Sequence, residues 1–273
     1  MVEASEAPSM SDEEGEPLRY AVHEGLAEIA FNRPYRLNAV NEAVYAAMHK
    51  ALLRAEEDET VRVVLLRGEG RAFCVGADLK AHGSGQRTPY QRRRYLEGEQ
   101  EVCRRILHLS KPVVAAVHGY ALGAGAEMAL AADFLLMSKS AKLGFPELSI
   151  GNFLGGGVTW LLPRLVGLAR ARELLFFGER LDGEQAERIG LANRAFDDEG
   201  FLESARLYAR ALAEKAPISM ELAKRTLLLA AGNSLEAALA AELEGMTFVA
   251  TTEDWREGVV AFAEKRPPRF RGR

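Results

Sequence analysis

Short apolar runs alternate with helical patterns in the first half of the chain, and this order most constrains the fold. Continuous apolar runs are typical of strands covered on both faces. Apolar residues three or four positions apart are typical of amphipathic helices. The expected strands are 20–22, 26–31, 61–66, 112–117 and 134–138, with helices at 41–56, 95–109 and 126–132. This alternation predicts an α/β fold in which βαβ units with right-handed crossovers surround a parallel sheet.

After Glu147 the strand signal nearly disappears, and helical patterns continue to the end of the chain. Asp182, Asn233 and Thr252 are suited to be N-caps, and Pro217 to be a first helical residue. Segment 1–17 has six acids, no base and no periodicity, which is typical of a disordered tail. We therefore divide the chain into a disordered acidic tail (1–17), an α/β core (18–200) and a C-terminal helical region (201–273).

Positive and negative charges nearly balance, with 35 Lys and Arg against 39 Asp and Glu and a formal net charge of −4. A basic field that could hold nucleic acid is therefore not expected. Five bases without an acid do occur in the last nine residues, 265–273. No apolar run approaches the roughly 20 residues that span a bilayer, so we expect no membrane partner.

Cysteine and histidine patterns exclude further classes of site. Cys74 and Cys103 form neither a disulfide framework nor a C-x-x-C pair, and a cytoplasmic location is expected. The five histidines show no H-x-x-x-H or H-E-x-x-H spacing, so we expect no metal site. A reactive thiol at Cys74 is conceivable, but a lone cysteine there is more often a small packed apolar residue.

Two loops rich in Gly and Ala follow predicted strands, at 70–80 and 118–127. Ligands of parallel sheets bind at the carboxyl ends of the strands, where such loops lie. Small residues let a backbone approach a ligand closely, and one N–H from each loop could form an oxyanion hole. The same glycines also suit tight turns and close helix–sheet packing, so both interpretations stay open at this stage.

Glu127 and Glu147 are the candidate acid–base residues. Glu127 lies among Ala, Met and Leu in a segment expected to be buried, where an unpaired carboxylate is expensive. Glu147 begins another helical segment, where an acid is also favoured by the helix dipole alone. Two carboxylates around an apolar pocket could hold a water with raised pKa values. Residues 155–157, three consecutive glycines, offer further backbone donors or simply a flexible helix start.

In order along the chain, these loops and several flanking motifs resemble the crotonase superfamily, the enoyl-CoA hydratase/isomerase family. The resemblance covers nearly everything after about residue 18. Its motifs are Asn32-Arg33-Pro34 with Asn38-Ala39, Gly76-Ala77-Asp78-Leu79-Lys80, Gly119–Glu127, Phe145-Pro146-Glu147, Leu162–Gly167, Ala186–Leu191 and Ala261–Pro268. The resemblance implies a crotonase-like spiral of βαβ units followed by helices that form trimers, often paired into hexamers.

The resemblance also implies roles for individual residues. The N–H groups of Ala77 and Ala124 would form the oxyanion hole for a thioester carbonyl. Glu127 would deprotonate the water that adds at C3, Glu147 would deliver a proton to C2, and Gly155 would offer an N–H near that water. The residues implied for the coenzyme A arm are Leu37, Ala77, Asp78, Leu79, Lys80 and Lys265. No cofactor is expected to be bound permanently, because coenzyme A is part of the substrate.

Both glutamates are present, which favours an enoyl-CoA hydratase. Two departures from the family pattern leave the acyl group open: Ala124 replaces a more usual Gly, and residues 152–154 replace an Ile-Pro stretch. The alternatives are a double-bond isomerase, a thioester hydrolase or a hydratase-lyase for an aromatic acyl group. A distant alternative is an RNA-binding member, against which the acidic body weighs.

Overall fold

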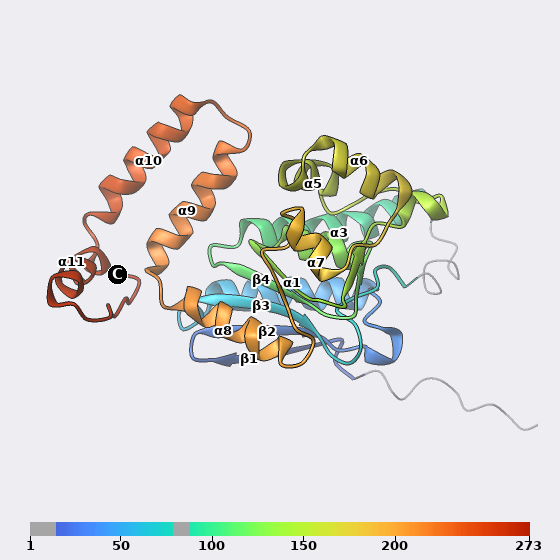
Figure 1. Cartoon of the computed structure of the whole chain (residues 1–273), viewed down its shortest axis with the longest axis horizontal. Coiled ribbons are helices and arrows are strands. Elements are labelled where there is room, and N and C mark those ends of the chain that lie inside the picture. Colours follow the sequence, from blue (N-terminus) through green and yellow to red (C-terminus); the bar gives the residue numbers. More distant parts are fainter. Residues whose placement is uncertain (1–14, 79–87) are drawn as a thin grey trace, which may run out of the picture.

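The computed structural model describes residues 15–78 and 88–273, with a six-stranded sheet in the order β1-β2-β3-β4-β6-β8 (Figure 1). The strands are β1 (Leu18–His23), β2 (Leu26–Phe31), β3 (Val63–Gly68), β4 (Val113–Val117), β6 (Phe134–Ser138) and β8 (Arg194–Phe196). β1 and β2 form an antiparallel hairpin and all other neighbours are parallel. The predicted α/β class and parallel sheet are confirmed. The acidic segment 1–14 lies outside the described residues.

Helices cover both faces of the sheet. On one face are α1 (Glu42–Glu57), α3 (Pro89–His108) and α4 (Ala124–Ala131), and on the other is α8 (Phe201–Ala213). Val64 and Leu66 pack into the first core, whereas Val63 and Leu65 pack with α8 into the second. Successive side chains of a strand point to opposite faces, so burial on both faces explains the continuous apolar run.

A second, small sheet stands beside the first. β5 (Tyr120–Leu122) pairs in parallel with β7 (Lys142–Gly144). The remaining elements of this part are η1 (Pro34–Arg36), η2 (Glu147–Ile150), α5 (Val158–Val166), α6 (Leu168–Phe177) and α7 (Gly183–Arg188). The expectation of almost no strand after Glu147 misses β8. This strand has three residues, and none of them is buried, so it produces no apolar run.

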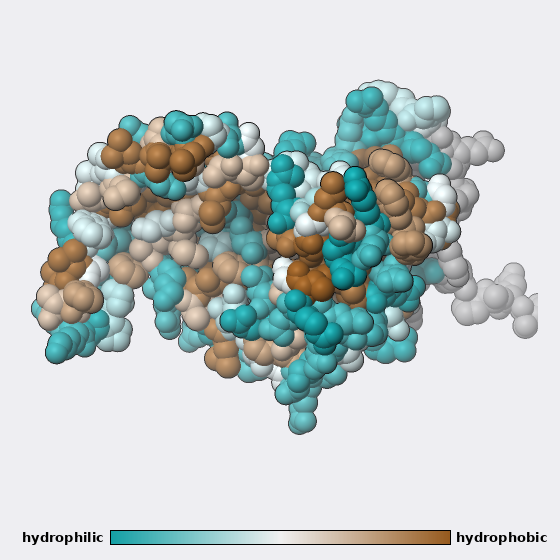
Figure 2. Space-filling view, turned by 45° about the horizontal axis from the view of Figure 1, so that its top comes forward, coloured by the Kyte–Doolittle hydropathy of each residue, from teal (hydrophilic) through white to brown (hydrophobic). Residues whose placement is uncertain are grey.

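The last three helices, α9 (Pro217–Ala230), α10 (Leu235–Val249) and α11 (Glu253–Glu264), stand apart from the sheet (Figure 1). In Figure 2 apolar residues gather on the outside of these helices. α8 falls within the region 201–273 but packs on the sheet, so the helices that stand apart begin at α9. None of the helices in the described parts of the chain is long and apolar enough to cross a membrane.

Lys224 anchors α9 to the core. Its Nζ lies 2.7 Å from Asp133 Oδ2 and donates to the carbonyl oxygens of Ile106 and Lys111 at 3.2 Å. Burial lowers the pKa of Lys224, and it raises the pKa of Asp133. A buried pair of this kind fixes one arrangement of α9, because separating the two groups would leave each buried charge without its opposite charge.

N-cap predictions are confirmed at Asp182 and Thr252, whose side chains accept from Gln185 N and Trp255 N. The prediction for Asn233 is wrong. Ser234 caps α10 instead, and the Asn233 amide donates to Leu229 O at the end of α9.

Candidate active site

The two Gly/Ala loops run side by side at the carboxyl ends of β3 and β4. Phe73 N donates to His118 O at 2.9 Å, Cys74 N to Tyr120 O at 3.0 Å, and Leu122 N to Cys74 O at 3.0 Å. These hydrogen bonds pair the two loops in parallel, as neighbouring strands of a sheet are paired. The loops are therefore held in one register, which brings the segments around residues 77 and 124 together.

Ala77 and Ala124 present their N–H groups at this junction. A methyl group on Gly76 would lie 3.4 Å from Ala124 N and 2.7 Å from Leu122 O, and Gly76 has a φ of +88°, so the approach depends on glycine. Ala124 is the first residue of α4, where N–H groups are left free by the helix. Both N–H groups are without a backbone acceptor in the part of the chain that the structure describes.

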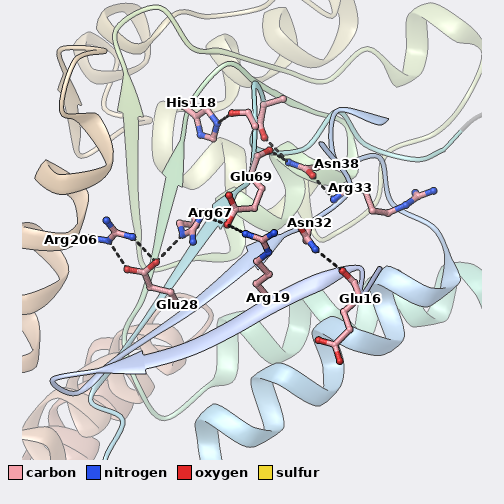
Figure 3. A network of polar contacts seen from close by, with 12 residues as sticks. Glu16, Arg19, Glu28, Asn32, Arg33, Asn38, Arg67, Glu69, His118 and Arg206 are labelled. Atoms are coloured by element: carbon pink, nitrogen blue, oxygen red, sulfur yellow. Dashed lines mark hydrogen bonds and ion pairs between the residues drawn. The ribbon is translucent and has the colours of Figure 1, made fainter. Parts of the chain in front are cut away.

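Asn38 and Arg33 hold the first loop from below (Figure 3). Asn38, which is buried, donates from Nδ2 to Glu69 O at 2.9 Å and to Ala72 O at 2.7 Å, and its Oδ1 accepts from Arg33 N at 2.9 Å. The Arg33 guanidinium donates to Ala39 O at 2.6 Å and pairs with Asp78 at 3.4 Å. The motif at residues 32–39 therefore supports the loop.

Elsewhere in Figure 3, polar contacts tie the sheet to α8. Glu28 of β2 accepts from Arg67 Nε of β3 at 2.8 Å and from Arg206 Nε of α8 at 2.6 Å. His118 Nε2 lies 2.9 Å from Gly70 O, within the first loop. These hydrogen bonds connect β2, β3, α8 and the first loop without a ligand.

Glu127 lies in the first turn of α4 and is only 2% exposed. Its Oε1 accepts from Gly155 N at 2.7 Å, and among the described residues its buried Oε2 has no hydrogen-bond partner. Burial is the largest cause that raises its pKa to about 9, followed by contact with Glu99, while the Gly155 N–H opposes the shift. Gly155, predicted to lie near the reacting water, thus orients this carboxylate.

Glu147 follows β7 and packs against the start of α4. A methyl group on Gly123, the N-cap of α4, would lie 2.5 Å from Glu147 Oε1. Glu147 is 7% exposed, and its Oε2 has no partner among the described residues. Burial raises its pKa, and the negative charge of Glu99 adds to the shift. The β5–β7 pairing thus brings Glu147 beside the helix that carries Glu127.

A third carboxylate, Glu99 of α3, was missed by the sequence interpretation. A methyl group on Gly155 would lie 3.0 Å from Glu99 Oε1 and 3.1 Å from Glu127 Oε2. The signal was present in the sequence, because Glu99 falls on the stripe formed by Tyr95, Val102 and Ile106, which are all buried. A charge on the apolar face of a helix points to a site or to a buried partner.

The cysteines do not take part as nucleophiles. Burial raises the pKa of Cys74 to about 12, and burial also raises the pKa of Cys103. Both thiols therefore stay protonated, and protonated thiols are poor nucleophiles. In the described residues no group of three or more His, Cys, Asp or Glu side chains could hold a metal ion.

The residues predicted for the coenzyme A arm fall in three places. Leu37, with a φ of +50°, accepts from Val75 N at 3.2 Å and so lies against the first loop with Asp78. Leu79 and Lys80 lie outside the described residues. Lys265 is the C-cap of α11, in the part that stands apart from the sheet (Figure 1).

The single chain does not bring Lys265 to the loops. The tail that follows Lys265 is tied by Arg271 O, which accepts from Arg62 Nη2 at 3.0 Å. Arg62 precedes β3, whereas the loop with Ala77 follows the other end of that strand.

Comparison with known proteins decides the family. Residues 21–273 match the family model described as enoyl-CoA hydratase/isomerase. The chain belongs to this family. A probable enoyl-CoA hydratase of Rhodobacter capsulatus is 39% identical over 94% of this chain and 98% of its own length. The 1,2-epoxyphenylacetyl-CoA isomerase of Escherichia coli K12 is 36% identical over 92% of this chain and 97% of its own length.

Solved structures of the enoyl-CoA hydratase/isomerase family share the fold. The enoyl-CoA hydratase of Bacillus anthracis superimposes with a TM-score of 0.90 at 32% identity, covering 94% of this chain and all of that one. A structure described as a putative enoyl-CoA hydratase of Streptomyces coelicolor gives a TM-score of 0.90 at 34% identity and covers 99% of this chain. The crotonase-like architecture expected from the motifs is confirmed.

Proposed function

We propose that the protein is an enoyl-CoA hydratase that adds water across the 2,3 double bond of a 2-enoyl-CoA thioester. One observation carries the proposal. Two buried glutamates, Glu127 and Glu147, each have a carboxylate oxygen without a partner among the described residues, and both flank the N-terminus of α4. Buried polar atoms are almost always hydrogen-bonded, so these oxygens are suited to a water and a substrate.

The geometry suits hydration as follows. The thioester oxygen would accept from the N–H groups of Ala77 and Ala124, which stabilises the enolate formed when oxygen adds at C3. Glu127, held by Gly155 N through Oε1, would take a proton from the water at Oε2. Glu147 would give its proton to C2. One water is consumed, and its oxygen and one hydrogen end on C3. The other hydrogen of the water passes to Glu127. It then reaches Glu147 through solvent and replaces the proton that Glu147 gave to C2.

The test is a panel of 2-enoyl-CoA thioesters of different chain length, with product mass as readout. Hydration adds the mass of one water, and we expect that gain for at least one member. Glu127→Gln and Glu147→Gln should each lower kcat by at least about a hundredfold with nearly unchanged thioester binding. Glu97→Gln, on the exposed face of α3, is the matched control. A panel without any hydrated product would refute the proposal.

Isomerisation is the second candidate, because the Escherichia coli relative is named an isomerase. An isomerase leaves the product mass unchanged, so the same panel separates the two activities. Hydrolysis of the thioester, or a hydratase-lyase step on an aromatic acyl group, would release free coenzyme A or an aldehyde fragment. The two glutamates favour hydration over these reactions, since addition of water needs both a base and an acid.

Self-association would complete the coenzyme A site. We propose that the chain forms trimers, alone or paired into hexamers, in which Lys265 of one copy approaches the loops of the next. Large apolar side chains left exposed in the single chain support this: Leu227, Leu235, Leu239, Leu243, Met246 and Phe262. Monomers rarely expose such surfaces. Light scattering should show a trimer or hexamer, and Lys265→Ala should raise KM with little change in kcat. The expected cytoplasmic location stays a prediction.

A further inference from the structure

Glu99 places a third carboxylate in the pocket of the two glutamates. It lies on α3, two turns after Gln91 and one turn before Cys103, on the face that packs toward α4. A single point above Gly155 is 3.0 Å from Glu99 Oε1, 3.1 Å from Glu127 Oε2 and 3.4 Å from Glu127 Oε1. Oxygens of both carboxyl groups therefore lie beside Gly155, the residue that orients Glu127.

Two facing carboxylates cannot bond to each other when both are ionised, because each is then only an acceptor. A hydrogen bond with the Glu99 carboxyl group is among the causes that raise the pKa of Glu127, yet without a proton between the two groups the buried Glu127 Oε2 has no donor among the described residues. A proton placed between them satisfies both oxygens. Like charges at this separation strongly favour the singly protonated pair.

We propose that Glu99 is a positioning residue that shares one proton with Glu127, so that the pocket holds one more proton than its two catalytic glutamates need. The shared proton bonds Glu127 Oε2 to the Glu99 carboxyl group, while Glu127 Oε1 accepts from Gly155 N. Both oxygens of Glu127 are then oriented, and the second lone pair of Oε2 is left for the water. The kinetic consequence rests on the proposed hydratase function, whereas the shared proton itself does not.

The groups around Glu99 and Glu127 favour a proton shared between the two carboxyl groups. Tyr45 of α1, Cys74 of the first loop, Cys103 of α3 and Glu147 of η2 are the titratable groups coupled to the pair. Each is neutral or negative near neutral pH, since burial raises the pKa of the tyrosine and of both thiols. The charges that raise the pKa of Glu127 are those of Glu99 and Glu147. Among the described residues, the charges with the largest effect on the pKa of Glu127 are thus negative, and a shared proton would offset them.

The test is a pH titration of the ligand-free enzyme labelled with carbon-13 in the glutamate carboxyl groups, followed by NMR. In the wild type we expect a carboxyl signal that titrates near pH 9. Glu99→Gln keeps the shape and a hydrogen-bond donor but removes the charge. It should move this step down by at least about one pH unit, and Glu127→Gln should abolish it. Glu97→Gln on the same helix should leave it in place.

Activity gives a second, separable readout. In Glu99→Gln the pH profile of hydration should shift by the same amount as the titration step, on the limb that reports this ionisation. A merely structural role of Glu99 would not produce this shift. If Glu99→Gln leaves the step near pH 9, burial of Glu127 alone accounts for it and the inference is wrong. If the titration shifts as expected but no thioester is hydrated, the shared proton stands and the proposed function fails.

Discussion

Replacing Glu127 with Gln should change how the stability of the protein depends on pH. The pKa of Glu127 in the folded protein is about 9, against an ordinary value of 4.5. Between these two values the folded chain keeps a proton that the unfolded chain releases. Stability therefore falls as pH rises through this window, and it falls by up to about 1.4 kcal/mol per pH unit for one proton. Below the window both states are protonated and the penalty vanishes.

Glutamine is always neutral, so Glu127→Gln removes this term and leaves the other titrating groups in place. From about pH 6 to 8, the variant should gain about 2 to 3 kcal/mol relative to the wild type. Urea unfolding at three pH values, at one fixed protein concentration, measures the difference. Glu97→Gln should show a constant offset, because that side chain is exposed. A Glu127→Gln offset that is equally independent of pH would refute the reasoning.

Three further predictions concern the supports of the site. Asn38→Ala removes two buried hydrogen bonds and one part-buried hydrogen bond and should lower the free energy of unfolding by about 3 kcal/mol. The exposed Asn233→Ala should cost less than about 1 kcal/mol, and urea unfolding measures both. Gly125→Ala sets a methyl group against the Cys74 carbonyl and 2.8 Å from Cys74 Cβ, so it should cost at least about 2 kcal/mol in thermal unfolding and tenfold in turnover; Gly98→Ala, with open space around it, should cost neither. Lys224→Met leaves Asp133 without its ion-pair partner and should destabilise by about 3 kcal/mol or more in denaturant. Adding Asp133→Asn removes the unpaired charge but keeps an acceptor for Val113 N, so it should recover part of this loss. A double variant as unstable as Lys224→Met would contradict this account of the α9 anchor.

Sequence periodicity predicts most elements because burial of a strand on both faces produces a continuous apolar run in the local sequence. The apolar run of β3 is continuous, since Val63 and Leu65 meet one layer of helices and Val64 and Leu66 meet the other. β8 has no such run, as its three residues are not buried. This strand forms by pairing with the edge of β6, and that edge exists only once the sheet has assembled.

The candidate site shows the same division. Glu127 and Glu147 follow from their motifs, but they are twenty residues apart, and the β5–β7 pairing brings Glu147 beside the start of α4, which carries Glu127. Glu99 was overlooked although it interrupts an apolar stripe. Glu99 lies on α3 and Glu127 on α4, and the local sequence pattern of one helix does not predict which residues of another helix it contacts.

Local interactions let the sequence by itself determine the parallel sheet, its covering helices, most helix caps and the two Gly/Ala loops, since these depend on neighbours along the chain. Distances between remote segments were decided only by the tertiary structure. It set the loops in register and placed the Glu99 and Glu127 carboxyl groups beside Gly155, with the Glu147 carboxyl group beside Gly123. It also carried Lys265 away from those loops, because the tail of α11 is held near Arg62 at the opposite end of β3.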